Sequence, residues 1–220
     1  MSTEKSKQPK DDFPSVLHEI DLATVKLVKK GGQGVLVSGN LIITAAHCID
    51  GLNWEGGLAL GDFCLQQLET FAGEKVIADV WYADAISDTA VLGSPDDQDR
   101  EAEAFERYCG ETKPVALCRR AFKFSQRFPV YIRNYNGKCV SGTGCQWNTE
   151  GCRLSVTAEE QIEGGASGGP VVNKAGLLLG INSFYGGGPG RAEDWGSIPQ
   201  LHRSLPVWLR ERIYREQGRC

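Results

Sequence analysis

The chain alternates short apolar runs with turn residues along most of its length. Residues 22–29 alternate apolar and polar positions, and further apolar or alternating runs follow at 34–37, 41–48, 57–63, 74–83 and 88–93. These runs are rich in β-branched residues, and several are separated by turn residues such as glycine, serine and asparagine. Such runs are typical of strands, and their close spacing favours an antiparallel barrel or sandwich over alternating strands and helices.

The rhythm changes at two places. Residues 96–112 are acidic and rich in helix formers, so we expect a linker with a short surface helix between two halves. Six more strand-like runs follow, and then Leu205, Leu209 and Ile213 recur four residues apart with Trp208 beside them. That spacing predicts an amphipathic helix docking on the body of the protein. The whole pattern predicts two β-barrel-like halves, a linker and a C-terminal helix.

Length and charge narrow the possible partners. The 220 residues fit one compact domain or two small ones, with a net charge of −4 and no dominant basic patch. Nucleic acid is therefore not an expected partner. The first residues, MSTEKSKQPKDDF, are charged, lack the apolar core of a secretory leader and predict a disordered tail. Since no later run is long enough to span a bilayer, no membrane partner is expected either.

The eight cysteines and three histidines do not form a familiar metal pattern. There is no CxxC pair, and although Cys139, Cys145 and Cys152 lie close together, their spacings match no common zinc site. We therefore expect free, mostly buried thiols, with no metal and no cofactor.

Three short motifs carry candidate chemistry. His47 ends an apolar run in TAAHC, Asp88 begins DTAVL, and Ser167 lies among four glycines in GGASGGP. Each has a plain structural alternative: a packed or surface histidine, a carboxylate that accepts from nearby backbone amides, and a surface turn. Taken together they follow the order His, Asp, Ser of chymotrypsin-type proteases.

On these motifs the chain resembles the trypsin/chymotrypsin-like serine proteases over residues 22–215. The resemblance implies an all-β fold of two six-stranded antiparallel β-barrels with a C-terminal α-helix. It also implies an active site in the cleft between the barrels. We expect a disordered tail at 1–20, a first barrel at 21–95, a linker at 96–112, a second barrel at 113–202 and a helix with tail at 203–220.

The resemblance assigns a role to each motif. Ser167 would be the nucleophile, His47 its general base and Asp88 the carboxylate that orients the imidazole. The backbone N–H groups of Gly165 and Ser167 would form the oxyanion hole. Asp84, four residues before Asp88, is a rival acid, but the family's acid directly precedes the small and apolar run, and Asp84 is then a loop residue.

The chain departs from digestive trypsins in its activation and cysteine pattern. Ala166 stands where those enzymes carry the aspartate that pairs with a freed N-terminus, and no IVGG-like start is present. Activation by N-terminal insertion is therefore not expected, so the site is either preformed or ordered by substrate or an activating partner protein. In secreted relatives a cysteine on the preceding strand forms a disulfide with the cysteine after the histidine, but here that strand has no cysteine to pair with Cys48. Glu163 stands where those relatives have a further cysteine before the serine loop. These features favour a cytoplasmic enzyme of the intracellular, bacterial-type or HtrA-like branch.

Substrate preference is less defined. Gln161 would form the base of the primary pocket, and because it is neutral it does not support a preference for basic residues. Glu193, Asp194 or Glu163 would add negative charge if their loops fold inward. Ser183, Phe184 and Tyr185 match the segment that pairs with substrate backbone. Tyr185 would either narrow the mouth of the primary pocket or, together with Phe184, cover the hydrophobic core.

The leading hypothesis is a regulated serine endopeptidase that acts on a protein or peptide substrate. One alternative is a catalytically silent module that binds extended peptides or a partner protein. Another is an esterase-like hydrolase with the same site.

Overall fold

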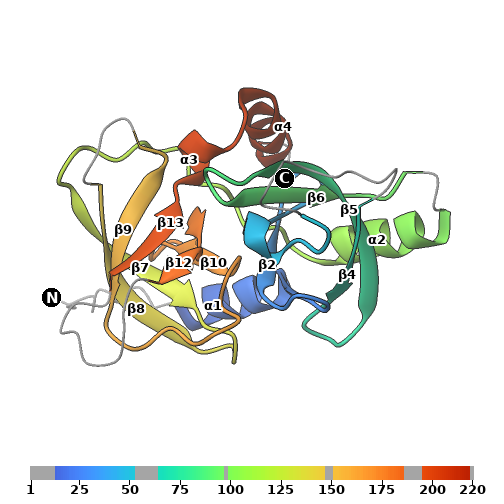
Figure 1. The fold of residues 1–220 in the computed structure, drawn as a ribbon, viewed down its shortest axis with the longest axis horizontal. Helices are drawn as coiled ribbons and strands as arrows, with labels where there is room; N and C mark the ends of the chain where they lie inside the picture. Colours follow the sequence, from blue (N-terminus) through green and yellow to red (C-terminus); the bar gives the residue numbers. More distant parts are fainter. Residues whose placement is uncertain (1–12, 53–63, 97–98, 147–150, 186–194, 219–220) are drawn as a thin grey trace, which may run out of the picture.

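The computed structural model describes residues 13–52, 64–96, 99–146, 151–185 and 195–218. The run expected at 57–63, residues 1–12 of the expected tail, and the candidate charges Glu193 and Asp194 lie outside these ranges. The described residues form two β-structures side by side, with helices above, below and at one end (Figure 1).

The N-terminal half is a closed six-stranded barrel in the order β1-β2-β3-β6-β5-β4. Every pairing within it is antiparallel. Strands β2, β3 and β6 are buried at every position, because β-branched and aliphatic residues there face the core or are covered by neighbouring elements. The strands are β1 (Thr24–Leu27), β2 (Gln33–Val37), β3 (Leu41–Thr44), β4 (Leu65–Glu69), β5 (Lys75–Asp84) and β6 (Thr89–Gly93).

The C-terminal half is an antiparallel sheet of seven strands in the order β11-β10-β7-β8-β9-β13-β12. A bridge between Gly180 of β11 and Gln200, which follows β13, connects one end of the sheet to the strand next to the other end. The prediction of two antiparallel barrels is thus confirmed, and the two-residue strand β12 is an addition to the second one. The strands are β7 (Arg127–Arg133), β8 (Cys139–Cys145), β9 (Arg153–Ala158), β10 (Pro170–Val172), β11 (Leu178–Ile181), β12 (Phe184–Tyr185) and β13 (Trp195–Pro199).

Helices join and cover the two halves. Helix α2 lies within the segment expected to link the halves, and α4 lies within the expected C-terminal helix (Figure 1). Helix α1 corrects the sequence analysis, since residues 13–20 were expected in a disordered tail. Its Ile20 is buried against the first core, and apolar packing of this kind stabilises a short helix. The helices are α1 (Phe13–Leu22), the 3₁₀ turn η1 (Ala46–Cys48), α2 (Asp99–Glu111), α3 (Leu201–Ser204) and α4 (Val207–Gln217).

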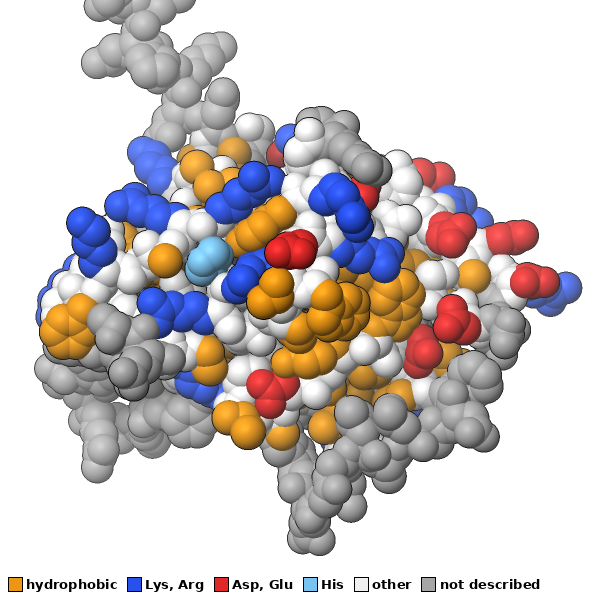
Figure 2. Space-filling model, turned by 90° about the horizontal axis from the view of Figure 1, so that it is seen from above, with side chains coloured by type: hydrophobic (Ala, Val, Ile, Leu, Met, Phe, Trp, Pro, Cys, Tyr) orange, Lys and Arg blue, Asp and Glu red, His pale blue; other side chains and the backbone are white. Residues whose placement is uncertain are grey.

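The C-terminal helix docks on the first half although it follows the second in sequence. Leu209 and Ile213 of α4 are buried in the core cluster that fills the first barrel, as the spacing predicts, and Leu205 is buried there too, although it lies before the first residue of α4 rather than inside the helix. Trp208 is instead 55% exposed, with Val207 beside it at 57%. Figure 2 shows the face that carries α4, where hydrophobic side chains gather beside lysines and arginines. The chain therefore returns from the second half to the first barrel, where Leu209 and Ile213 hold α4.

Candidate active site

Strand pairing brings His47 and Asp88 together from positions 41 residues apart. His47 lies in η1, directly after β3, and Asp88 directly precedes β6. Strands β3 and β6 are antiparallel neighbours, so the end of one lies beside the start of the other. The backbone N–H of Ala46 donates to the carbonyl of Asp88 at 3.2 Å and closes this junction.

Both carboxylate oxygens of Asp88 accept hydrogen bonds from His47. The ring Nδ1 lies 2.8 Å from Oδ2, and the backbone N–H of His47 donates to Oδ1 at 2.9 Å. Asp88 is 7% exposed and has a positive φ of 55°, a backbone strain that persists only where its surroundings hold it. This geometry fixes the imidazole and leaves its Nε2 free of the carboxylate.

The second half supplies a further donor to the same carboxylate. The hydroxyl of Ser183 donates to Oδ2 of Asp88, across 95 positions of sequence. Arg153 of β9 lies on the other side, with Nη1 donating to the Ser183 hydroxyl at 3.2 Å. Because arginine only donates, the Ser183 proton is directed to Asp88. The sequence analysis placed Ser183 in the substrate segment, and no local pattern signals this longer-range contact.

These contacts shift both pKa values in the direction of an ion pair. The hydrogen bond to Asp88, followed by one to Cys48, raises the pKa of His47 above its ordinary 6.5. Burial alone would raise the pKa of Asp88, but the hydrogen bonds from His47 and Ser183 outweigh it and lower the value below 3.8. Asp88 is therefore ionised at neutral pH, where it stabilises a positive charge on the imidazole.

The glycines before Ser167 form a tight turn. The N–H of Ala166 donates to the carbonyl of Glu163 at 3.3 Å, and Gly165 has a φ of +88°. A positive φ at the third position of a β-turn is the type II geometry, which favours glycine. A Cβ at residue 165 would also lie 2.8 Å from the Tyr135 ring. Within the described chain, the N–H groups of Gly165 and Ser167 have no hydrogen-bond partner.

The Ser167 loop packs directly on the strands that carry His47. The carbonyl of Ser167 accepts from the N–H of Gln33 at 2.7 Å and from the Cys48 thiol at 3.8 Å. Gly168, with a φ of +78°, passes so close to β2 that a Cβ there would lie 2.0 Å from the Gln33 carbonyl. Among the described residues, the Ser167 hydroxyl makes no hydrogen bond to the His47 ring. The backbone of Ser167 therefore contacts Cys48, the residue that follows His47 in sequence.

The other residues weighed in the sequence analysis, namely Gln161, Phe184, Tyr185 and Asp84, make separate contacts. Gln161 is exposed, and its backbone carbonyl accepts from the Asn134 side chain at 3.5 Å. Phe184 and Tyr185 form β12, which pairs with β13, but their side chains lie outside the described part of the structure. Asp84 uses its carboxylate to accept from the N–H groups of Ile86 and Ser87, so it caps the turn before Asp88.

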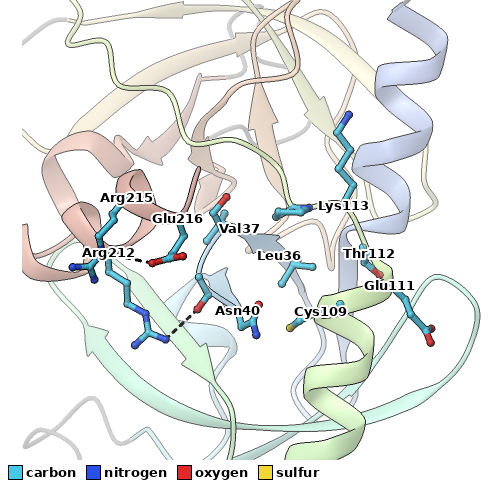
Figure 3. Close-up of a pocket in the computed structure, with 14 residues that line it drawn as sticks. Leu36, Val37, Asn40, Cys109, Glu111, Thr112, Lys113, Arg212, Arg215 and Glu216 are labelled. Carbon is cyan, nitrogen blue, oxygen red and sulfur yellow. Dashed lines mark hydrogen bonds and ion pairs between the residues drawn. The ribbon is translucent and has the colours of Figure 1, made fainter. Parts of the chain in front are cut away.

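A separate cavity of about 790 Å³ lies among the β2–β3 turn, the end of α2 and helix α4. Figure 3 shows its lining, in which Arg212 donates to the Gly39 carbonyl and Arg215 pairs with Glu216. None of its lining residues belongs to the predicted site.

The described cysteines are all free, at positions 48, 64, 109, 118, 139, 145 and 152. Across the described residues, no three metal-ligating side chains of the His, Cys, Asp or Glu type come together. No helix in the described ranges has the length and apolarity needed to cross a bilayer.

Comparison with known proteins agrees with the two-barrel fold. The Rv3671c protease of M. tuberculosis matches in its inactive form with a TM-score of 0.56, 16% identity, and coverage of 98% of this chain and 97% of that one. Its active form matches with a TM-score of 0.57, 16% identity, and coverage of 97% and 87%. Both show a shared fold. A search of curated proteins gives no match. A sequence model described as the trypsin-like peptidase domain matches residues 32–181, and the chain therefore belongs to this family.

Proposed function

We propose that this chain is a serine endopeptidase that uses His47, Asp88 and Ser167. The observation that supports this most strongly is the buried Asp88 carboxylate, which accepts from the ring and backbone of His47 and from Ser183. A carboxylate held this firmly against one imidazole is what a general base needs for a defined tautomer. The neighbouring Ser167 loop supplies a nucleophile of the right type.

In the proposed reaction, the Ser167 hydroxyl attacks the carbonyl carbon of a bound peptide. A new C–O bond forms and the hydroxyl proton passes to Nε2 of His47, while the carbonyl oxygen becomes an anion. Asp88 stabilises the imidazolium that results. His47 then protonates the leaving amine as the C–N bond breaks, and a water molecule later hydrolyses the acyl-enzyme by the same steps.

The oxyanion is bound by the N–H groups of Gly165 and Ser167. Neither group donates elsewhere in the described chain, so both are available to an incoming oxygen. Donors that are already oriented require no rearrangement at the moment of reaction, which makes them effective.

The proposed enzyme does not depend on an inserted N-terminus. Ala166 is 1% exposed and carries no carboxylate that a freed amine could pair with. We place the activity in a reducing, cytoplasmic compartment, because the seven described cysteines are free and Cys48 has no disulfide partner. A regulated protease with a narrow choice of protein substrate fits this setting.

The test is labelling by a fluorophosphonate probe, followed by cleavage profiling with a peptide library. Wild-type protein should be labelled and should cleave, whereas Ser167→Ala should do neither. Loss of any triad member should lower kcat by about 10⁴-fold or more.

Two other results would change the assignment. Tight peptide binding that Ser167→Ala leaves unchanged, without labelling or cleavage of any peptide, would indicate the silent binding module. Labelling with hydrolysis of simple esters and no peptide cleavage would indicate an esterase.

A further inference from the structure

A chain of polar side chains, buried at Arg133 and Gln33 and partly exposed at Asp21, connects helix α1 to the turn before Ser167. Nε of Arg133 donates to Oδ1 of Asp21 at 2.6 Å, and Nη1 of Arg133 donates to the side-chain oxygen of Gln33. The side-chain nitrogen of Gln33 then donates to the carbonyl of Gly165 at 3.4 Å. Gln33 is 0% exposed and Arg133 is 7% exposed. Four separate segments of the chain thus meet through three side chains.

The chemistry of the arginine gives this chain a direction. A guanidinium only donates hydrogen bonds, so the Gln33 amide must turn its oxygen toward Arg133. Its NH₂ group is then left to face the Gly165 carbonyl. Arg133 is itself charged and buried, and Asp21 is its carboxylate partner. A change at Asp21 can therefore reach Gly165 through side chains alone.

The chain ends on the peptide unit that shapes the turn. The carbonyl of Gly165 accepts from Gln33, and the N–H on the other side of that peptide unit, at Ala166, donates to Glu163. The backbone N–H of Gln33 also donates to the Ser167 carbonyl at 2.7 Å. Gln33 is in turn anchored by Thr44, whose hydroxyl donates to its carbonyl at 2.6 Å. One buried glutamine therefore contacts both residues proposed to bind the oxyanion.

We propose that Asp21, Arg133 and Gln33 are positioning residues that hold the oxyanion-binding turn in its working geometry. This inference rests on the proposed function and adds the contact that orders the site. The negative charge comes from helix α1, while Ala166 offers none. Helix α1 is itself packed on the second half, with the Phe13 and Tyr131 ring centroids 4.3 Å apart. The oxyanion-binding turn therefore depends on the packing of α1, which places Asp21 beside Arg133.

The test compares Asp21→Asn and Gln33→Met with the matched control Glu19→Gln. Glu19 lies on the same helix and undergoes the same change of carboxylate to amide, but its ion pair with Lys113 is exposed. For each protein we would measure kcat and KM, binding of a peptide aldehyde, and the amide NMR resonance of Gly165. The aldehyde forms a bond to Ser167 and an oxyanion, so its affinity reports on the turn. Binding of an uncleaved peptide in the Ser167→Ala background reports on the ground state.

We expect kcat to fall about 10-fold in Asp21→Asn and about 100-fold in Gln33→Met, with KM within about twofold of wild type. Aldehyde affinity should fall in parallel, ground-state peptide affinity should not, and the Gly165 resonance should shift. Asp21→Glu, which keeps the charge, should recover most of the activity. Glu19→Gln should match wild type throughout.

Folded Asp21→Asn and Gln33→Met proteins with the kcat and Gly165 resonance of the Glu19→Gln control would overturn the inference. A parallel loss of kcat and of ground-state peptide affinity would also overturn it, because it indicates general structural damage. If Asp21→Asn unfolds at the assay temperature, Arg133→Lys, which keeps the charge but loses the forked donor group, is judged by the same criteria. A wild-type protein that neither cleaves nor is labelled refutes the proposed function, and with it this inference.

Discussion

The two halves of the molecule hold their parts of the candidate site in different ways. In the first barrel, His47 and Asp88 are adjacent because two neighbouring strands are antiparallel, and their contact is a direct hydrogen bond of 2.8 Å. In the second half, Gly165 and Ser167 lie in a turn whose geometry depends on side chains from α1, β2 and β7. The first arrangement comes from sheet pairing and the second from long-range polar contacts.

This difference indicates where the site is easiest to disturb. A sheet register is fixed by many hydrogen bonds and by the buried side chains of a closed barrel. A glycine turn has few contacts of its own, so a small number of neighbours decides its conformation. The base and its carboxylate should therefore tolerate distant changes better than the oxyanion-binding turn.

The largest effect on kcat should come from a substitution at Asp88, in the first half. Asp88→Asn should lower kcat by about 10⁴-fold, since the amide no longer stabilises the imidazolium. It should also lower the pKa of His47, which the hydrogen bond to Asp88 raises above 6.5. NMR titration of the His47 ring would follow this change, and an unchanged midpoint would contradict the assigned pairing.

The same pair predicts how stability depends on pH. Because folding raises the pKa of His47, its protonation stabilises the folded state. The full stabilisation is present at pH values below the ordinary pKa of 6.5, and it is lost as the pH rises through the pKa of the folded state. The lowered pKa of Asp88 stabilises the fold above its ordinary 3.8, and this is lost as pH falls. The difference in thermal unfolding midpoint between wild type and Asp88→Asn should be greatest between these two pH values.

A smaller effect on kcat should come from a substitution at Gly165, in the second half. Gly165→Ala places a Cβ 2.8 Å from the Tyr135 ring at a φ of +88°, so the turn must shift and kcat should fall by about 10² to 10³-fold. Gly73→Ala is the matched control, because Gly73 has a φ of +83° and no atom within 4 Å of its added Cβ. Equal kcat values for the two variants would argue against an oxyanion role for residue 165.

A more modest effect on kcat should come from removing the hydrogen bond between Ser183 and Asp88, which links the two halves. Ser183→Ala removes one hydrogen bond to the Asp88 carboxylate and should lower kcat about 10-fold, as expected for a bond to a charged group. Ser204→Ala is the control, since Ser204 is equally buried at 8% and its hydroxyl has no partner in the described structure. A kcat for Ser183→Ala equal to that of the control would remove Ser183 from the site.

The smallest effect on chemistry should come from the helix that joins the halves. Leu209→Ala should lower the free energy of unfolding by about 2–5 kcal/mol, because Leu209 is 0% exposed in the first core. Trp208→Ala, at a 55% exposed position, should change it by less than about 0.5 kcal/mol. Both should keep kcat near wild type. Chemical denaturation followed by fluorescence and circular dichroism would measure this, and a single shared transition would show that the halves unfold together.

The sequence by itself determined the class of fold and the residues worth testing. Runs of β-branched residues separated by turn residues fix which segments become strands, because side-chain alternation and turn chemistry are local properties. The spacing of Leu209 and Ile213 likewise marks the buried side of α4, although Leu205 lies before that helix begins. His47, Asp88, Ser167 and the glycines near the serine were identifiable from short motifs and their order.

Only the tertiary structure decided how those residues are held. Helix α1 was missed because a ten-residue helix depends on packing against distant apolar groups rather than on its own propensity. Ser183 and Gln33 act through contacts 95 and 132 positions away, and no local pattern encodes such distances. A hydrogen bond between side chains depends on the relative placement of whole strands and helices, and that placement exists only once the core has formed.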